Sequence, residues 1–264
     1  MREINAMTTP ETSPAFRSNS NEFWLAWTFL TRFPAPVTID YSPEALNRAA
    51  RFFPWVGLLL GLFQALVYVL ANAVFGHAFF AALCSVAAVV VATGAFHEDG
   101  FADYCDSFGG TDTAQRLTIM TDSRLGTFGV AGLVFVLCWR VAALTLLPFT
   151  LALLAIVLSA VVSRWLAISL MLSLPYAKTD GKSKPMSNSI DQGALRTAAI
   201  PLIPVVFLVN WQTLLMLAVI LAVFRVGFSA QLRERLGGFT GDSLGAAQQM
   251  AEVLVYGSLL SVGG

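Results

Sequence analysis

Residues 52–96 contain no Asp, Glu, Lys or Arg. About 20 mainly apolar residues suffice to cross the hydrocarbon core of a bilayer, and this run is long enough for two crossings. Only 12% of the whole chain is charged, whereas a typical soluble domain has about 25%. The sequence therefore predicts an all-α, polytopic integral membrane protein.

Seven windows of the sequence are candidates for transmembrane helices, and six remain if the fifth does not cross. The fifth window is short and contains Pro201 and Pro204, which favour a kinked or partly inserted segment. The windows cover residues 55–74, 77–96, 128–149, 151–174, 198–210, 212–232 and 246–261.

The N-terminal part of the chain differs from the rest. Residues 1–21 are rich in Ser, Thr, Pro and Asn, a composition typical of a disordered lead-in. Residues 22–33, EFWLAWTFLTRF, are too short to span and rich in Trp and Phe, so we expect an interfacial helix. Residues 22–264 are then expected to form one membrane-embedded catalytic domain.

The charged residues are concentrated in segments that follow every second window. Residues 97–124, 178–196 and 233–242 carry most of them, whereas the turns near residues 75–77, 148–150 and 210–211 carry none. Lys and Arg close to a span favour the cytoplasmic side. We therefore expect these three polar segments to face the cytoplasm and the C-terminus to lie outside.

Charge and cysteine content exclude several other classes of protein. The formal net charge is zero, so no global field attracts nucleic acid. Cys84, Cys105 and Cys138 are odd in number and widely spaced, which fits neither a disulfide framework nor a zinc site. We interpret them as small apolar packing residues.

The stretch HEDGFADYCDSFGG, residues 97–110, places acidic residues directly after the apolar run. Asp99, Asp103 and Asp106 are spaced i, i+4, i+7 and share one face of a helix. Such like charges repel one another, and Mg²⁺ binds through one or two carboxylates plus substrate phosphates. The alternative is a solvated helix end. Glu98 lies about 100° around the helix from Asp99 and is the weakest member of the cluster.

Three other features near this stretch are candidates for substrate binding. Gly100 permits close approach of a ligand or of a second helix. Asp122, Ser123, Arg124 and Gly126 form a polar turn suited to a phosphate, unless Arg124 only snorkels beside a helix cap. His97 is either a catalytic group or a rim residue with a satisfied hydrogen bond.

Ionisable residues also lie inside the windows. Arg140, Arg164 and Arg225 are expensive to bury and are expected to point toward partners, either the acidic cluster or an anionic substrate. Glu252 is expected to lie well inside the last window. Before it, Gly241 and Asp242 belong to a Gly-rich turn that opens a helix, which is a natural but weakly specific anion cradle.

Several of these motifs, in this order, resemble those of the cobalamin synthases, formally adenosylcobinamide-GDP ribazoletransferases. They are TRFPAP, FFPWVGLLLG, HEDGFADYCDSFGG, RLTIMTDSRLGTFGV and GGFTGDSLGAA, and the resemblance runs from about residue 22 to the C-terminus. It implies a Mg²⁺-dependent enzyme of the bacterial inner membrane. That enzyme joins adenosylcobinamide-GDP to α-ribazole or its 5′-phosphate and releases GMP.

The resemblance also implies roles for particular residues. We expect catalysis to involve Asp103, Asp106, His97 and Arg124, and Mg²⁺ to be bound by Asp99, Asp103 and Asp106. We expect the substrate to be bound by Gly100, Asp122, Ser123, Gly126, Gly241 and Asp242. We add Arg164 to these because it lies inside a window, where it could hold an anionic substrate. The family often has an apolar residue in place of Glu98 and Gly in place of Ser107, which leaves the role of Glu98 and the approach of the substrate at Ser107 open.

Two other functions compete with this one. CDP-alcohol phosphotransferases use similar chemistry, but their full acidic motif is absent. A cation- or proton-coupled transporter would use Asp99, Asp103, Asp106 and Glu252 as an ion path, although such paths usually lie near the bilayer midplane between repeats. The sequence leaves open whether the protein forms a homo-oligomer. A groove lined by Trp139, Trp165 and Phe228 is our hypothesis for entry of the corrinoid.

Overall fold

The computed structural model describes residues 14–177 and 192–263, and it confirms the all-α prediction for them. Within these ranges the extended pairing is limited to one isolated bridge, between Tyr176 and Phe239. The helices are α1 (Pro14–Leu30), α2 (Pro43–Ala49), α3 (Phe53–Phe75), α4 (Ala78–Thr93), α5 (Phe96–Asp106), α6 (Thr113–Ile119), α7 (Thr127–Leu146), α8 (Phe149–Met171), α9 (Gln192–Ala199), α10 (Leu202–Val206), α11 (Trp211–Leu236) and α12 (Gly241–Gly263).

The described helices support fewer crossings than the predicted seven. Four segments are long and apolar enough to span: Pro43–Phe75, Thr127–Leu146, Phe149–Met171 and Trp211–Leu236. A fifth is the pair α4 and α5, which meet the same requirement together but are bent by 89° where they join. The protein is thus a multi-pass membrane protein, and its described residues contain four such helices, or five if the bent pair counts as one.

Two of the predicted windows account for the difference. The window at residues 198–210 is divided between the end of α9 and the five-residue α10, because Pro201 and Pro204 interrupt helical hydrogen bonding. The window at residues 246–261 lies in α12, which has 23 residues. Helix α12 is long enough, but Gln248, Gln249 and Glu252 lower its mean hydropathy.

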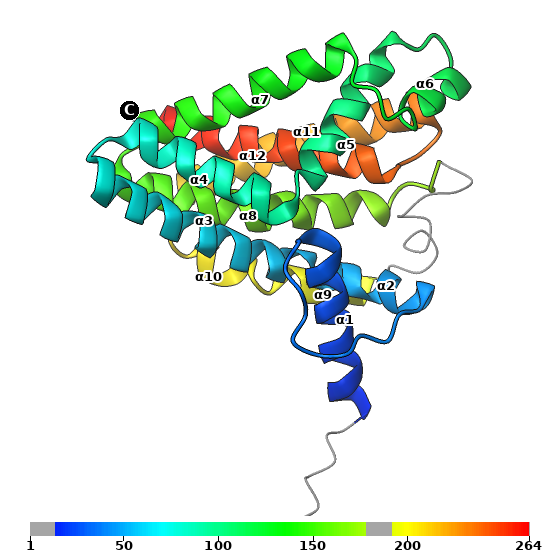
Figure 1. Ribbon diagram of the computed structural model, residues 1–264, viewed down its shortest axis with the longest axis horizontal. Coiled ribbons are helices and arrows are strands. Elements are labelled where there is room, and N and C mark those ends of the chain that lie inside the picture. The colour runs from blue at the N-terminus through cyan, green and yellow to red at the C-terminus, as the bar shows by residue number, and fades with distance from the viewer. Residues whose placement is uncertain (1–13, 178–191, 264) are drawn as a thin grey trace, which may run out of the picture.

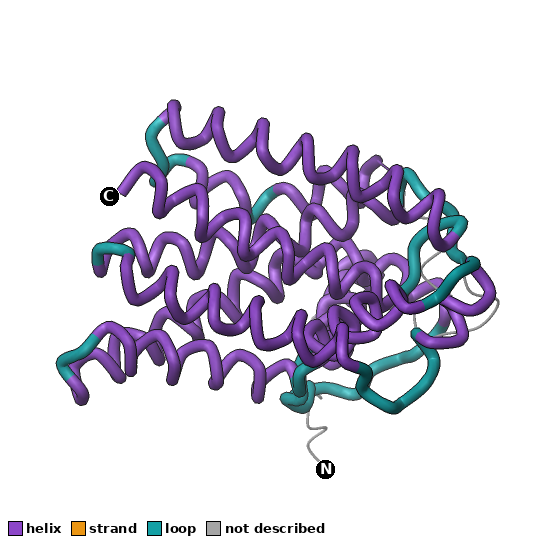
Figure 2. The backbone as a smooth tube through the Cα atoms, turned by 90° about the horizontal axis from the view of Figure 1, so that it is seen from above, coloured by secondary structure: helices purple, strands orange, loops and turns teal. Residues whose placement is uncertain are grey.

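The helices run side by side, and their connections gather at the two ends of the bundle (Figures 1 and 2). The turns after α3 and α7 lie at the same end as the C-terminus, whereas α6 and the α11–α12 connection lie at the other (Figure 1). Thr113 Oγ1 and Arg116 Nη1 donate to the Arg235 carbonyl over 3.2 and 3.3 Å. Two of the three predicted polar segments therefore share an end; most of the third lies outside the described residues.

Helix α8 is the most enclosed of the apolar helices and packs against α3 and α12. Gly61 on α3 makes this contact close, because a Cβ there would lie 3.1 Å from both Ala160 Cβ and Val157 Cα. Lipid chains are as apolar as the helices, so the hydrophobic effect does not drive helices together inside a membrane. Small residues instead let the helices approach closely and attract one another by dispersion forces.

Helix α1 crosses the direction of the long helices (Figure 1), as an interfacial helix would. It begins at Pro14, earlier than the predicted residue 22, so part of the predicted lead-in is helical. Residues 1–13 lie outside the described part. The buried Glu22 carboxylate pairs with Arg48 and Arg51, which joins α1 to the chain entering α3.

Candidate active site

A sharp turn places the acidic helix α5. Gly94 and Ala95 both adopt the left-handed backbone conformation, with φ of 67° and 57°. Glycine takes this conformation freely, whereas a residue with a Cβ pays roughly 1–2 kcal/mol. The turn bends the chain by 89° and directs α5 into contact with α7 and α12. A strained residue therefore lies immediately before the predicted site.

A cavity of about 440 Å³ lies between α5 and the α6–α7 connection. We call it the acidic pocket. Asp99 and Asp103, one helical turn apart on α5, line it together with Asp122 from the connection. Its other polar lining residues are Glu98, Thr121 and Ser123. The structure thus brings together four predicted site residues, namely Asp99, Asp103, Asp122 and Ser123.

The rim of the acidic pocket is a compact turn. Arg124 Nη2 lies 2.6 Å from Asp122 Oδ2, and the Arg124 backbone N–H donates to Asp122 Oδ1 over 3.0 Å. These hydrogen bonds lower the pKa of Asp122 to about 2, so its carboxylate is ionised throughout the neutral range. The Arg124 side chain is 87% exposed and does not line the pocket, although it lies beside it.

Asp106 is held in a different way from Asp99 and Asp103. Its carboxylate accepts hydrogen bonds from the backbone N–H groups of Gly126 and Gly129 over 2.7 and 2.8 Å. These groups belong to the first turn of α7, where backbone donors have no partner in the helix. A Cβ on either glycine would press against the Asp106 carboxylate. Asp106 and Gly126 therefore fasten α5 to the start of α7, and Asp106 does not line the pocket.

We expect Asp106→Ala to lower the free energy of unfolding by about 2 kcal/mol, because two hydrogen bonds to a charged acceptor are lost. Thermal unfolding of the detergent-solubilised protein measures this. Asp99→Ala is the matched control, because the Asp99 side chain is exposed and forms no hydrogen bond or ion pair with the described residues. Equal stability of the two variants would show that Asp106 does not anchor α7.

The other predicted residues of α5 face away from the acidic pocket. His97 lines a small buried cavity of about 40 Å³ with Arg164 of α8 and Gly241 of α12. Gly100 lies where α5 crosses α12, and a Cβ there would be 2.9 Å from the Asp242 Cα. The body of α5 therefore separates these residues, His97, Gly100, Arg164, Gly241 and Asp242, from the acidic pocket. The close crossing of α5 and α12 accounts for a glycine at position 100.

A buried ionic network lies beneath the acidic pocket. Arg140 Nη1 is 3.3 Å from Glu98 Oε1, and Arg140 Nη2 is 3.0 Å from Glu252 Oε2. Arg164 Nη1 lies 3.9 Å from Glu252 Oε1 and donates to the Ala160 carbonyl over 2.8 Å. We call Glu98, Arg140, Arg164 and Glu252 the buried ionic network; each residue is at most 6% exposed.

These contacts confirm that the intramembrane arginines point toward partners. Arg225 lies apart from the network: its Nε donates to Ser169 Oγ over 2.9 Å and its Nη2 to the Ser169 carbonyl over 2.7 Å. Glu98, which spacing alone ranked last among the acids, is the member of α5 that joins the network. In the sequence, the signal for this network was the presence of Arg140 and Glu252 as single charges inside apolar windows, because each of them needs a buried partner.

The donor set of the acidic pocket bears on the predicted metal. Among the described residues there is no group of three or more His, Cys, Asp or Glu side chains that could hold an ion. Mg²⁺ usually binds through one or two carboxylates and completes its shell with water and phosphate oxygens. Asp99 and Asp103 fit that mode, whereas the predicted triad with Asp106 does not form.

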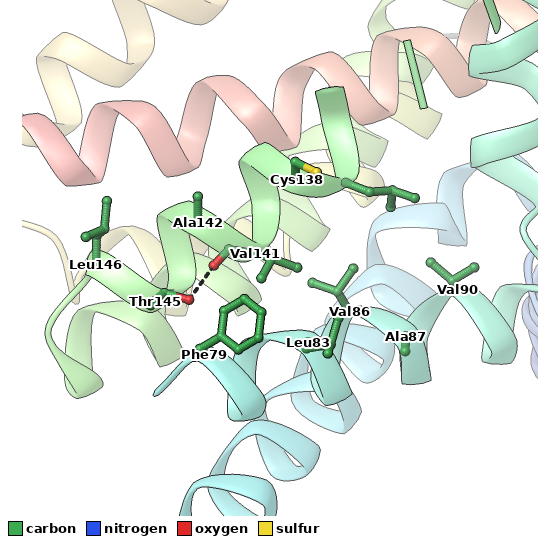
Figure 3. A pocket seen from close by; sticks show the side chains of 11 residues that line it. Phe79, Leu83, Val86, Ala87, Val90, Cys138, Val141, Ala142, Thr145 and Leu146 are labelled. Carbon is green, nitrogen blue, oxygen red and sulfur yellow. Dashed lines mark hydrogen bonds between the residues drawn. The ribbon is translucent and has the colours of Figure 1, made fainter. Parts of the chain in front are cut away.

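Two apolar cavities differ from the acidic pocket in chemistry. A larger one, about 720 Å³, lies between α4 and α7; its only side-chain oxygen, Thr145 Oγ1, bonds the Val141 carbonyl over 2.7 Å (Figure 3). Trp139 lines another with Phe224, whereas Phe228 is 3% exposed and packs on Tyr104. The hypothesis of one groove containing Trp139, Trp165 and Phe228 is therefore not supported.

Comparison with known proteins identifies the family. The model of the family described as cobalamin-5-phosphate synthase matches residues 22–260. The chain belongs to this family. No solved structure matches it.

Curated relatives agree with this membership along almost their whole length. An adenosylcobinamide-GDP ribazoletransferase of Vibrio cholerae is 42% identical over 243 residues, which cover 90% of this chain and 93% of the relative. A protein of the same name from Ralstonia nicotianae is 39% identical over 252 residues, 94% of this chain and 97% of the relative. The predicted membership in the cobalamin synthase family is confirmed.

Proposed function

We propose that the protein joins adenosylcobinamide-GDP to α-ribazole or its 5′-phosphate, releases GMP, and does so in the acidic pocket. The observation that carries this proposal is the meeting of Asp99 and Asp103 with Asp122 and Ser123 in one cavity. These residues come from two separate motifs of the family resemblance. The names of the curated relatives support the same reaction.

The reaction is a displacement at phosphorus. A ribose hydroxyl oxygen of the acceptor forms a bond to the cobinamide-linked phosphorus, and the bond from that phosphorus to the bridging oxygen breaks. GMP leaves with the bridging oxygen, and the hydroxyl proton passes to a base. Such reactions ask the protein mainly for positioning and charge stabilisation.

Asp103 is the carboxylate that we assign as the base. It lines the acidic pocket, whereas both oxygens of Asp106 accept backbone hydrogen bonds at α7. A base must come within hydrogen-bond reach of the proton that it removes. The contacts of Asp106 therefore suit it to hold the site together rather than to move a proton.

Asp99 and Asp103 would hold Mg²⁺ together with the phosphates of the substrate. When bound, the ion neutralises charge that develops on the diphosphate oxygens. Asp122 keeps Arg124 at the rim of the pocket, where its guanidinium is exposed and able to meet an incoming phosphate. We also propose that the pocket faces the cytoplasm from the bacterial inner membrane, because Lys and Arg cluster at this end.

Release of GMP by the purified, detergent-solubilised protein tests the proposed function. With adenosylcobinamide-GDP and α-ribazole, we expect GMP formation to require both substrates and to fall about a hundredfold or more when Mg²⁺ is removed by a chelator. Restoring Mg²⁺ should restore the rate, which controls for damage by the chelator. Folded protein that forms no GMP would contradict the assigned reaction, and rates that ignore the chelator would contradict the metal.

A further inference from the structure

An open groove between α3 and α4 is separate from the acidic pocket. It has a volume of about 640 Å³, and its walls come from these two helices and the segment that follows α1. Small side chains such as Ala87 and Ala88 leave the surface of α4 recessed, and Val91, another lining residue, is 73% exposed. Because residues 52–96 carry no charged side chain, the groove opens toward the hydrocarbon of the bilayer. We call it the α3–α4 groove.

Arg32 is the one charged residue that lines the α3–α4 groove. Its side chain is exposed and forms no hydrogen bond or ion pair with the described residues. Its backbone N–H donates to the Ala92 carbonyl over 2.8 Å, in the last turn of α4. The arginine therefore lies at one end of the groove. Cys84, which lines the groove further along α4, is roughly 12 Å from that end.

Aromatic rings indicate that the Arg32 end of the groove lies at the boundary between membrane and water. The Phe33 ring stacks on Trp27 of α1 with centroids 5.9 Å apart, and its centroid is 6.4 Å from that of Phe63 on α3. Tryptophan is enriched at this boundary, and α1 crosses the direction of the long helices there (Figure 1). An arginine at this depth attracts the anionic headgroups of lipids, whereas the apolar channel beside it suits hydrocarbon.

We propose that the α3–α4 groove binds an anionic phospholipid, with the lipid phosphate on the Arg32 guanidinium and one acyl chain along α4. A phospholipid carries an anion and hydrocarbon in the order in which the groove presents a cation and an apolar wall. A guanidinium also donates two parallel hydrogen bonds to a phosphate. The site is separate from the acidic pocket, so it adds a lipid ligand to the protein whichever reaction takes place there.

The same arginine lies against the turn that sets the direction of α5. A Cβ on Gly94 would collide with Arg32 Nε, and Gly94 is followed by Ala95, the strained residue of this turn. A phosphate that holds Arg32 would therefore restrict the turn. We expect bound lipid to slow the opening of its hydrogen bonds, such as the one that the Ala95 N–H donates to the Val90 carbonyl over 2.8 Å.

Native mass spectrometry of the delipidated, detergent-solubilised protein tests the lipid site. The probes are phosphatidylglycerol and phosphatidylcholine with the same acyl chains. We expect the unmodified protein to bind its first phosphatidylglycerol about 5- to 20-fold more tightly than its first phosphatidylcholine. In Arg32→Gln this preference should fall below about twofold. In Ala88→Phe, whose ring would fill the groove, phosphatidylglycerol should bind about threefold more weakly or worse.

Arg196→Gln is the matched control, because Arg196 is also exposed and without a hydrogen bond or ion pair to the described residues, but does not line the groove. It should keep the preference of the unmodified protein. An unmodified protein without a preference, or the same loss in both arginine variants, would overturn the proposal, because general surface charge would then explain the binding. Unchanged binding in Ala88→Phe would overturn the place of the acyl chain. Competition by glycerophosphoglycerol, the headgroup without acyl chains, would show a site for free phosphate esters instead of a lipid.

Hydrogen exchange tests the link between the lipid and α5. Saturating phosphatidylglycerol should slow exchange of the backbone amides of residues 94–99 about fivefold or more in the unmodified protein, and it should not do so in Arg32→Gln. Unchanged exchange with lipid bound would overturn the link and leave the binding site in place. Neither measurement uses GMP release, so failure of the proposed reaction and failure of the lipid site are distinguishable.

Discussion

Asp103→Asn is expected to lower kcat for GMP formation by about 10²- to 10⁴-fold, the range that loss of a general base usually produces. The amide keeps the shape of the side chain, but it neither takes up the hydroxyl proton nor offers an anionic oxygen to Mg²⁺. Asp103 lies in the acidic pocket, so the effect should fall on chemistry more than on folding. Steady-state GMP release at saturating substrate measures it.

Two comparisons make the Asp103 result specific. Asp40→Asn removes the charge of an exposed carboxylate whose backbone, not its side chain, bonds Asn21, and it should keep full activity. Thermal unfolding of Asp103→Asn should match that of the unmodified protein within a few degrees. A variant with near-normal kcat would remove Asp103 as the base, and a variant that unfolds early would show that its role is structural.

The sequence predicted for a sound physical reason that Asp99 and Asp103 lie together. Asp99 and Asp103 are one turn apart on the same helix face, and local periodicity carries that information. The same periodicity placed Asp106 with them, yet its carboxylate turns to donors about 20 residues further along the chain. The N-cap residue of helix α7 is Gly126, which has no side chain that could cap the helix. That missing cap was the one local indication that a remote acceptor was needed.

Other parts of the site depend on which helices pack against one another. The spacing of residues along the chain does not contain that information. His97 and Asp99 are only two residues apart, but α5 lies between separate cavities, so they serve different surroundings. Gly100 is required by the crossing of α5 and α12. The helices that pass a test of length and apolar composition are fewer than the seven predicted windows for a related reason. Helix α12 carries several polar side chains, which lower its mean hydropathy, and other helices surround it.

The strongest expected effect on stability comes from Arg140. We expect Arg140→Gln to lower the free energy of unfolding by about 3–5 kcal/mol, the usual result of breaking a buried ion pair by removing one partner. Glu98 and Glu252 would both lose their nearest cation, and their burial limits how far water can compensate. Reversible unfolding of the protein in mixed micelles, driven by a denaturing detergent, measures the change.

Arg225→Gln is the control for Arg140, since Arg225 is an intramembrane arginine whose bonds go to the Ser169 hydroxyl and carbonyl and the Ser173 hydroxyl. Its loss should cost about 1–3 kcal/mol, because no buried acid is left unpaired. The double variant Glu98→Gln with Arg140→Gln should be more stable than the sum of its single effects implies, since neutralising the acid relieves part of the unpaired charge. Strict additivity, or an Arg140 effect no larger than that of Arg225, would mean that the acids beneath the pocket do not depend on this arginine.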